Sequence, residues 1–514
     1  MKKVTFLLFP LFVASNSLAQ PTVVWQNWFD YNGGSDFPSQ VRIDQDDNIF
    51  VLGTSDVDTF NNDIMIIKIN AEGVTEWHNL IRNDLDDVPI GIEVDNNGNC
   101  FVGGNLGDPS LENRGFISRY NADGTQIWVD TPSTTISSLC IDKTDNLYGK
   151  FGDKNIRVIK YNISGETLLD FTNDTITTLN TPSLRVIQTD SDGNIYVVGD
   201  YSSNGGDICV MLKKFSSEGL LFWEVKYNPT EDEEHFRFME LDDLGNIYIA
   251  GWIGSYDGII LVKFNSEGEL VWDDKIYDGS GLPYDLKLDS DGHPVICGKV
   301  FEVHNVTEYI LRKYDHFGNV VWTDYIDSAG SAYDKIAHLT SDTNGNIYFA
   351  ATMWPVTLSL PSFLMCMYDE NGIKLWEYRA DSLLSLGDFV TAIVLDPLGN
   401  IIVSMRSNVV DSKTDFLTMK FSLVTGMGEM PIHRTLLNVL PNPFHADAVV
   451  TTSNYSLLNQ ASTITIIDLY GRTMKSASYC NNYQLDRAGI PSGVYLVKVV
   501  AASGVSAIAK IIIL

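Results

Sequence analysis

Short apolar runs alternate with polar turns along most of the chain, and one unit returns at intervals of about fifty residues. Each unit opens with an apolar strand, a D-x-x-G-N turn and a second strand of the Asn-Ile-Tyr-Val type. Asp accepts backbone N–H groups at such a turn and Gly takes a positive φ, so the pattern predicts a tight hairpin. The turn Asp stands at Asp95, Asp190, Asp242, Asp342 and Asp396, with weaker copies at Asp44, Asp142 and Asp289.

The second half of the unit predicts two more strands. One ends in Lys-Phe or Lys-Tyr, and the next carries Trp four residues after a turn Gly, although the third unit has Leu169 instead. Four antiparallel strands repeated radially form a β-propeller, so eight units predict an all-β fold with an eight-bladed propeller. The Gly and Trp pairs are Gly73 and Trp77, Gly124 and Trp128, Gly219 and Trp223, Gly268 and Trp272, Gly318 and Trp322, and Gly372 and Trp376.

The two ends of the repeat region predict how the ring closes. The eighth unit reaches Lys420 and Phe421 without a following Gly-plus-Trp strand, whereas Val23-Val24-Trp25 is an isolated copy of that strand. We therefore expect residues near 23 to 28 to complete the last blade as its outer strand, which removes a free sheet edge. The alternative is an open or seven-bladed arrangement with one unit placed elsewhere.

These units resemble a bacterial β-propeller repeat family. Its units read D-x-x-G-N-I-Y-V-x-G, then an acidic residue before a K-[FY] strand, then G and W, and the match covers residues 21 to about 425. The resemblance implies the fold. It implies little about function, because members of this kind are mostly uncharacterised surface or secreted proteins.

A different β-rich segment follows a linker at 426–432. Its motifs are P-N-P-F, I-x-D-x-x-G-R, G-x-Y-x-V-K-V and a final K-I-I, in that order. They resemble the type A C-terminal sorting domain of the type IX secretion system of Bacteroidetes. The resemblance implies an immunoglobulin-like β-sandwich at 433–514 that the type IX machinery recognises and usually removes after export. The motif residues are Pro441, Asn442, Pro443, Phe444, Gly471, Gly493, Tyr495 and Lys510.

The first residues predict a signal peptide over 1–19. Lys2 and Lys3 precede an apolar stretch, and small residues lead to a cleavage site between Ala19 and Gln20. The propeller then occupies 20–425. No later segment has the roughly 18 consecutive apolar residues of a membrane helix. We expect a protein that crosses the periplasm and outer membrane to the cell surface or the medium.

The net charge and the cysteine content limit the classes of partner and cofactor that the protein can bind. The formal charge is −31, and loss of the peptide, whose only charges are Lys2 and Lys3, makes it −33. Nucleic acid is therefore an unsuitable partner, since phosphate affinity comes from Lys and Arg. The six cysteines are scattered singly without a metal or haem motif, which predicts buried free thiols. We expect a monomer.

Acidic residues recur at the start of the first strand, eight residues before the turn Asp. We expect them to ring the mouth of the central channel, where oxygen ligands suit a cation such as calcium. The alternative is that each carboxylate bonds backbone N–H groups of its own or the neighbouring blade. The residues are Asp36, Asp87, Glu234, Asp334 and Asp388; a second acidic position, with the same alternative, precedes the third strand at Asp63, Asp207, Asp257, Glu308 and Asp415.

The long loops fall on one face of the predicted ring, which is where binding residues concentrate. Aromatic side chains there suit a glycan or protein ligand, although scattered exposed aromatics are also ordinary. No Ser, Cys, zinc or haem motif indicates catalysis. We therefore predict a binding or scaffold protein without a catalytic cofactor; the alternative is an extracellular enzyme acting on polysaccharide at this face. The aromatics are Trp252, Tyr256, Tyr277, Tyr284, Tyr333 and Trp354.

Overall fold

The computed structural model divides into two compact units, 1–425 and 426–514, each considered by itself. The predicted signal peptide, residues 1–19, lies outside the described residues, which begin at Gln20. Described are residues 20–513 except 59–60, 83–84, 108–113, 153–155, 174–182, 203–207, 229–233, 255, 277–279, 302–306, 328–335, 354–360, 381–386, 409–413, 424–436, 441–445, 453–461, 469–471, 480–482, 488 and 501–505.

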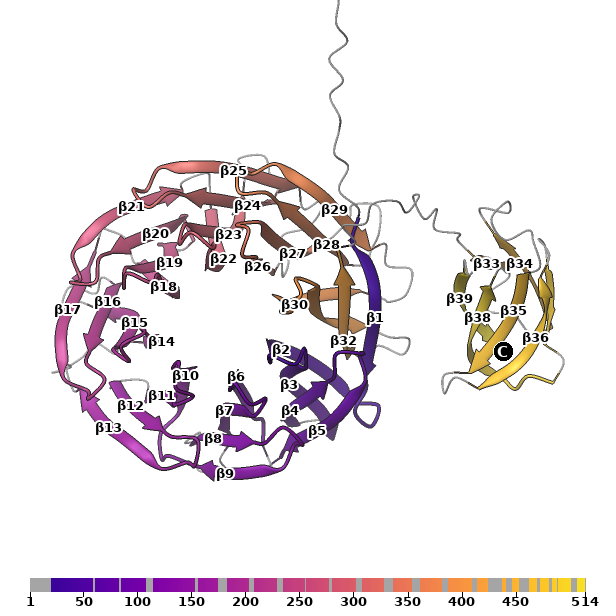
Figure 1. The fold of residues 1–514 in the computed structure, drawn as a ribbon, viewed down its shortest axis with the longest axis horizontal. Coiled ribbons are helices and arrows are strands. Elements are labelled where there is room, and N and C mark those ends of the chain that lie inside the picture. The colour runs from indigo at the N-terminus through magenta and orange to yellow at the C-terminus, as the bar shows by residue number, and fades with distance from the viewer. Residues whose placement is uncertain are drawn as a thin grey trace, which may run out of the picture. The chain divides into compact units, whose positions relative to one another are not determined.

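The described part of the first unit contains eight antiparallel sheets of four strands, which we call blades 1 to 8 (Figure 1). The predicted all-β class is confirmed. Blades 1 to 4, each from inner to outer strand, are β2 (Ser35–Ile43), β3 (Ile49–Asp58), β4 (Asn61–Ile69) and β5 (Thr75–Ile81); β6 (Val88–Val94), β7 (Cys100–Leu106), β8 (Arg114–Tyr120) and β9 (Gln126–Asp130); β10 (Ile136–Ile141), β11 (Leu147–Phe151), β12 (Ile156–Tyr161) and β13 (Thr167–Asn173); and β14 (Ser183–Thr189), β15 (Ile195–Ser202), β16 (Ile208–Phe215) and β17 (Leu221–Tyr227).

The remaining blades follow the same strand order, except that blade 8 takes its outer strand from the N-terminus. They are β18 (Glu234–Leu241), β19 (Ile247–Ile253), β20 (Gly258–Phe264) and β21 (Leu270–Ile276); β22 (Ser280–Leu288), β23 (Pro294–Phe301), β24 (Thr307–Tyr314) and β25 (Val320–Asp327); β26 (Ala337–Ser341), β27 (Ile347–Met353), β28 (Ser362–Tyr368) and β29 (Lys374–Ala380); and β30 (Asp388–Leu395), β31 (Ile401–Asn408), β32 (Thr414–Ser422) and β1 (Thr22–Phe29).

The ring of blades is closed. The inner strands contact one another in turn from β2 to β30, and β30 contacts β2. The N-terminal strand β1 pairs antiparallel with β32, with Phe29 opposite Phe416. In Figure 1 it forms the outer edge of the last blade, which is the placement that the isolated Trp25 strand predicts. The first and last parts of the unit are thereby joined in one sheet.

Apolar packing lies between consecutive sheets. One buried cluster joins Phe50 and Ile64 of blade 1 to Cys100 and Phe116 of blade 2, and each of these four side chains is at most 1% exposed. Such contacts remove apolar surface from water on both faces of a blade, which is the main source of stability in a sheet stack. The described cysteines are free, and all but Cys140 are buried.

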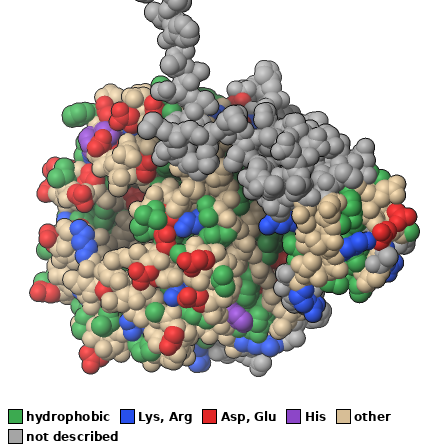
Figure 2. Space-filling model, turned by 45° about the vertical axis from the view of Figure 1, so that its right-hand side comes forward, with side chains coloured by type: hydrophobic (Ala, Val, Ile, Leu, Met, Phe, Trp, Pro, Cys, Tyr) green, Lys and Arg blue, Asp and Glu red, His purple; other side chains and the backbone are tan. Residues whose placement is uncertain are grey.

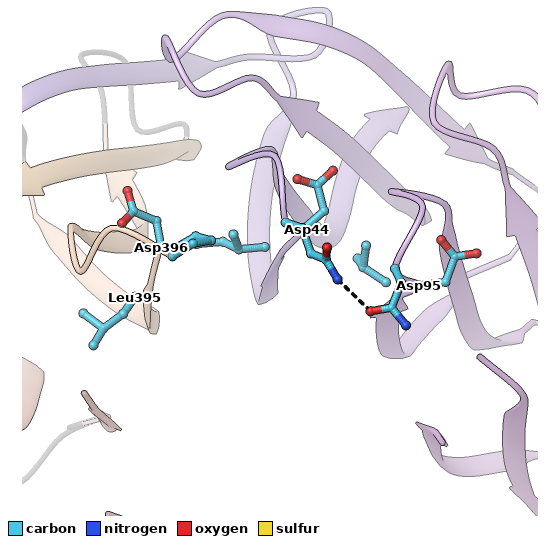
Figure 3. Close-up of a pocket in the computed structure, with 9 residues that line it drawn as sticks. Asp44, Asp95, Leu395 and Asp396 are labelled. Carbon is cyan, nitrogen blue, oxygen red and sulfur yellow. Dashed lines mark hydrogen bonds between the residues drawn. The ribbon is translucent and has the colours of Figure 1, made fainter. Parts of the chain in front are cut away.

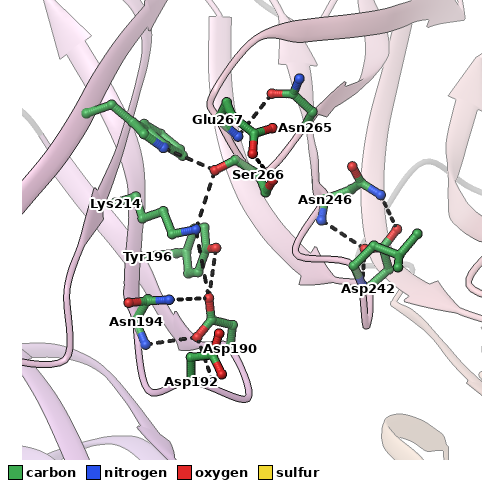
Figure 4. Close-up of polar contacts among 12 residues, drawn as sticks. Asp190, Asp192, Asn194, Tyr196, Lys214, Asp242, Asn246, Asn265, Ser266 and Glu267 are labelled. Atoms are coloured by element: carbon green, nitrogen blue, oxygen red, sulfur yellow. Dashed lines mark hydrogen bonds and ion pairs between the residues drawn. The ribbon is translucent and has the colours of Figure 1, made fainter.

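The D-x-x-G-N turn is stabilised by its own Asp, as Figure 4 shows for Asp190. Its Oδ1 accepts the backbone N–H groups of Asp192 at 3.0 Å and Asn194 at 2.9 Å. Its Oδ2 accepts the Tyr196 hydroxyl at 3.0 Å, and the Lys214 ammonium lies 3.9 Å away. The turn Asp therefore serves the hairpin locally, as the motif predicts.

The repeated Trp and Lys fasten each blade to the next. The Trp223 indole and the Lys214 ammonium both donate to the Ser266 carbonyl of blade 5, at 3.2 and 3.4 Å (Figure 4). Because one main-chain oxygen receives both donors, the outer parts of two blades are held at a fixed separation. The same two donors meet one carbonyl at Ala122 from Trp77 and Lys68, at His316 from Trp272 and Lys263, and at Glu370 from Trp322 and Lys313.

The second unit consists of two antiparallel sheets around one buried core, to which Val450, Ile464 and Val497 belong. The predicted immunoglobulin-like topology stays a prediction. One sheet holds β33 (Leu437–Leu440), β34 (Asp447–Thr452) and β37 (Tyr483–Asp486); the other holds β36 (Thr473–Tyr479), β35 (Ser462–Asp468), β38 (Gly493–Val500) and β39 (Ser506–Ile513).

Across the described residues of both units, no helix has the length and apolar character needed to cross a membrane.

Candidate functional site

The described acidic residues predicted to ring the channel lie at or next to the first residue of an inner strand and are buried. Asp36, Asp87 and Glu234 are at most 2% exposed, and Asp388 is 8% exposed. Asp334 lies outside the described residues. A cation site shared by these carboxylates around the channel stays a prediction, since each belongs to a different blade.

Each of three carboxylates accepts a local donor. Asp36 Oδ2 accepts the backbone N–H of Tyr31 at 2.8 Å, and Asp87 Oδ1 accepts that of Gly107 at 3.0 Å. Asp388 Oδ1 accepts the Ser407 hydroxyl at 2.5 Å. These are bonds of the kind expected if the recurrent acids support the blades.

The structure brings the two recurrent acidic positions together where blade 8 meets blade 1. Carboxylate oxygens of Asp30, Asp36 and Asp415 all lie within 4.8 Å of one another. We call this group the closure triad. Burial raises the pKa of Asp36 to about 6, and the charges of Asp30 and Asp56 act in the same direction.

Asp30 was missed by sequence reasoning, which considered only the two repeated positions. It follows the last residue of β1, whereas Asp415 lies in β32 and Asp36 in β2. Only the pairing of β1 with β32 places Asp30 beside Asp415. Of the other residues at the second acidic position, Asp257 forms a parallel bridge with Gly281 of the next blade, and Asp207 lies outside the described residues.

A second group, which we call the Arg–Trp cluster, lies on blades 4 and 5. Trp252 is 6% exposed and stacks on His235 at 4.9 Å between ring centroids. The Arg237 guanidinium also lies over the Trp252 ring, 4.7 Å from the ring centroid. Tyr256 is 47% exposed and lies 5.8 Å from Trp252. Arg185 completes the cluster.

Asp200 is the acidic residue of this cluster. Its Oδ2 lies 3.2 Å from Arg185 and 3.1 Å from His235 Nδ1. Arg237 forms no ion pair with a described residue. Its pKa is lowered by burial and by the nearby Arg185 charge. The cluster therefore carries more cationic than anionic groups.

Bulges in the inner strands place the two arginines. The pairing of β14 with β15 skips Arg185 between Leu184 and Val186, and that of β18 with β19 skips Arg237 between Phe236 and Phe238. A bulge leaves its extra residue unpaired and turns its side chain. Sequence reasoning identified Trp252 and Tyr256 but missed both arginines, because the strand pattern gives no signal of a skipped residue.

Of the other predicted aromatics, Tyr284 is described, and its ring contacts a residue outside the cluster. Tyr284 packs against the buried Tyr309, with ring centroids 6.3 Å apart. Tyr277, Tyr333 and Trp354 lie outside the described residues. A ligand role for these aromatic side chains stays a prediction.

An open depression of about 300 Å³ lies among the first turns of blades 8, 1 and 2 (Figure 3). Gln45 donates to Asn96 across it at 2.9 Å. Its carboxylates serve their own turns, since Asp44 accepts from Asp46 and Asp396 from Leu398, each at 2.9 Å. The depression therefore has few unused groups with which to hold a ligand.

Among its described residues, the face shown in Figure 2 carries no single dominant acidic patch. In Figure 2, red acidic side chains are spread over the visible face and alternate with blue Lys and Arg. A distributed charge of this kind favours solubility more than one acidic docking site.

Three of the residues in the sorting motifs are described. Gly493 and Tyr495 lie in β38, and the Tyr495 hydroxyl donates to the Pro491 carbonyl at 2.9 Å. Lys510 lies in β39 opposite Leu496. The other motif residues, Pro441, Asn442, Pro443, Phe444 and Gly471, lie outside the described residues.

Comparison with known families identifies the second unit. Residues 438–514 match the family described as the secretion system C-terminal sorting domain. The C-terminal unit is therefore a sorting domain of the type IX secretion system, which confirms the prediction from its motifs. A search of curated protein sequences gives no match.

Several solved structures are similar to the chain at low identity. BamB from Moraxella catarrhalis is 11% identical with a TM-score of 0.47, and the alignment covers 78% of this chain and 100% of that one. The WD40 domain of Toxoplasma gondii coronin is 11% identical with a TM-score of 0.42, covering 81% and 91%. A polysaccharide lyase of family PL25 is 12% identical with a TM-score of 0.42, covering 77% and 96%. At these values the likeness assigns no function.

Proposed function

We propose that this chain is a binding protein that reaches the cell surface or the medium through type IX secretion. The sorting domain at 438–514 carries this proposal and supports export by that route. The ring of eight sheets supports a binding role, because a rigid closed scaffold positions loops and inner-strand side chains for recognition. The N-terminal signal peptide would start the export.

We further propose that the Arg–Trp cluster is the ligand site and that its ligand is an acidic glycan. Arg237 supports this assignment, because it is exposed and has no carboxylate partner among the described residues. A guanidinium binds a carboxylate or sulfate in a bidentate way, and an exposed aromatic ring such as Tyr256 stacks on a sugar face.

The overall negative charge does not prevent such binding. At physiological salt the Debye length is about 8 Å, so distant surface carboxylates are largely screened. The nearby groups then dominate, and the charged ones are the two guanidinium groups of Arg185 and Arg237 against the one carboxylate of Asp200. A short acidic oligosaccharide suits this local balance better than a long polyanion, which would also meet the acidic surroundings.

Export is tested in a host that has a type IX system. The full chain should appear outside the cell, whereas a chain ending at residue 437 should accumulate in the periplasm. Fusion of residues 438–514 to a periplasmic reporter should restore export of that reporter. Release of the truncated chain at the wild-type level would contradict the proposed route.

Ligand binding is tested by calorimetry of the purified mature chain with uronate-containing, sulfated and neutral oligosaccharides. We expect binding of an acidic oligosaccharide that weakens at least about tenfold in Arg237→Gln, since charge-assisted bonds contribute roughly 1.5–3 kcal/mol. Arg379→Gln is the matched control, because Arg379 is 49% exposed and pairs with Glu377 on an outer strand. Equal affinity of all three proteins would contradict the site, and cleavage of the oligosaccharide would favour the enzymatic alternative.

A further inference from the structure

The closure triad joins the three strands that close the ring. Asp30 directly follows the closing strand β1, Asp415 lies in β32 of the same blade, and Asp36 lies in β2, the inner strand of blade 1. Their carboxylate oxygens lie within 4.8 Å of one another. Three negative charges at this separation repel one another unless a cation or protons intervene.

The buried member of the triad has an unused oxygen. Asp36 is 0% exposed, and no donor is in hydrogen-bond geometry with its Oδ1 among the described residues; the neutral Ser55 hydroxyl on the paired strand interacts with the carboxyl and opposes the rise of its pKa, but it carries no charge. Neither Asp30 nor Asp36 forms an ion pair with a described Lys or Arg, and a buried oxygen of Asp56 also lacks a partner. A buried carboxylate oxygen without a donor is costly, so it points to a positive group.

We call the junction between two consecutive blades a seam. The seam between blades 1 and 2, next to the closure of the ring, contains a positively charged group at the equivalent place. Strand pairing sets Phe29 opposite Phe416 in blade 8 and Ile81 opposite Ile64 in blade 1. The residue after Ile81 is Arg82, whose Nε lies 3.4 Å from Asp63 Oδ2. Asp63 and Asp87 are the repeat equivalents of Asp415 and Asp36, and Arg82 is the equivalent of Asp30.

The closure seam, between blades 8 and 1, thus has both recurrent acids. Its third acid, Asp30, stands where the neighbouring seam has the Arg82 guanidinium. The repeat itself therefore indicates that a cation is needed at this position.

We propose that the closure triad binds a hard divalent cation, calcium in the first place, and that this ion fastens the N-terminal strand to the ring. Carboxylates are the ligands that hard cations prefer, and exposed Asp30 leaves room for the water that completes the six to eight oxygens of calcium. The ion replaces the charge that Arg82 supplies at the next seam. Calcium binding is then coupled to ring closure and raises the stability of the whole unit.

The test compares thermal unfolding of the mature full-length protein in EDTA and in about 5 mM calcium, a concentration suited to an extracellular site of roughly 10⁻⁴–10⁻³ M affinity. We expect calcium to raise the Tm of the wild type by about 2 to 4 °C. Asp415→Asn should reduce the shift, and Asp30→Arg should abolish it. In EDTA, Asp30→Arg should melt above the wild type, because it recreates the arrangement of the Arg82 seam.

The control is Asp192→Asn, which removes an exposed acid from a turn in blade 4 and should leave the calcium shift unchanged. Calorimetry should find one calcium site that is present in Asp192→Asn and absent in Asp30→Arg. The proposal is overturned if calcium does not raise the wild-type Tm, or if Asp30→Arg and Asp415→Asn respond as the wild type does. An equal loss of response in Asp192→Asn would also overturn it, since that result means diffuse binding to the acidic surface.

Discussion

The indole of Trp25 lies directly beneath Gly73, a residue of the neighbouring blade. A Cβ atom built on Gly73 would be 2.5 Å from Trp25 Cδ2, and the Trp25 indole donates to the Ala71 carbonyl of the same turn at 2.9 Å. The Gly and the Trp of one repeat unit lie four residues apart in the sequence. In the fold, however, the Gly contacts the Trp of the preceding blade, as Gly124 contacts Trp77. The spacing therefore encodes contacts that hold the ring together.

Gly73→Ala should destabilise the ring more than Gly399→Ala. Both glycines have a positive φ, +84° and +81°, so each substitution costs roughly 1–2 kcal/mol in the backbone. Only Gly73 touches an indole, because nothing lies within 4 Å of a Cβ on Gly399. Displacing Trp25 should add about 1–3 kcal/mol, measured by urea unfolding. Equal losses in the two variants would contradict the contact.

Lys420→Met should be strongly destabilising. The Lys420 side chain is 7% exposed, and its ammonium lies 2.8 Å from Asp396 and 3.1 Å from Asp47 of blade 1. Its loss leaves the buried Asp396 carboxylate unpaired, which costs about 3–5 kcal/mol in such pairs. Lys374→Met is the control, because Lys374 is 32% exposed and its pairs should contribute less than about 1 kcal/mol. Urea unfolding of both variants checks the difference, and a similar loss in both would argue against the buried pair.

Local chemistry explains why much of the fold could be predicted. The Asp190 hairpin closes within six residues, and the isolated Trp25 strand matches a partner that the eighth unit lacks. The closure triad could not be found in this way, because Asp30 and Asp415 come together only when the ring closes. The positions of Arg185 and Arg237 depend on strand bulges, for which the alternation of polar and apolar residues gives no sign.

The third unit shows a limit of matching a motif by spacing alone. Leu169 occupies the Trp position, opposite Lys160 in the strand pairing. A Cβ on Gly219 of the next blade would instead meet the Phe171 ring, at 2.7 Å from Cδ1. Phe171 is two residues further along β13 and so on the same face, where its ring reaches the position that the indole fills elsewhere.

Phe171→Ala should therefore cost more stability than Leu169→Ala. Phe171 also packs on Phe215, with ring centroids 5.0 Å apart. Because it is only partly buried, we expect a loss of about 2 kcal/mol, below the roughly 3–5 kcal/mol of a fully buried Phe. Thermal unfolding of the two variants provides the comparison. A larger loss for Leu169→Ala would mean that Leu169 carries the interblade contact.

The pH dependence of stability should include a contribution from Asp142. Burial opposes ionisation of this turn carboxylate, but hydrogen bonds from Thr144 and Asn146 outweigh it and lower the pKa to about 2. In the unfolded chain the group titrates near 3.8. The folded state therefore gains stability from the ionised form above pH 3.8, and that gain is lost as the pH falls toward 2.

Asp142→Asn should accordingly lower the urea midpoint by a constant amount between pH 5 and pH 8 and by progressively less from about pH 4 downward. Asp243→Asn is the control, since Asp243 is an exposed turn residue whose replacement should change stability by less than about 0.5 kcal/mol. A difference between wild type and Asp142→Asn that grows as the pH falls would show that the sign of the shift is wrong. A difference that does not vary with pH would mean that the hydrogen-bond geometry, and not the charge of Asp142, stabilises the turn.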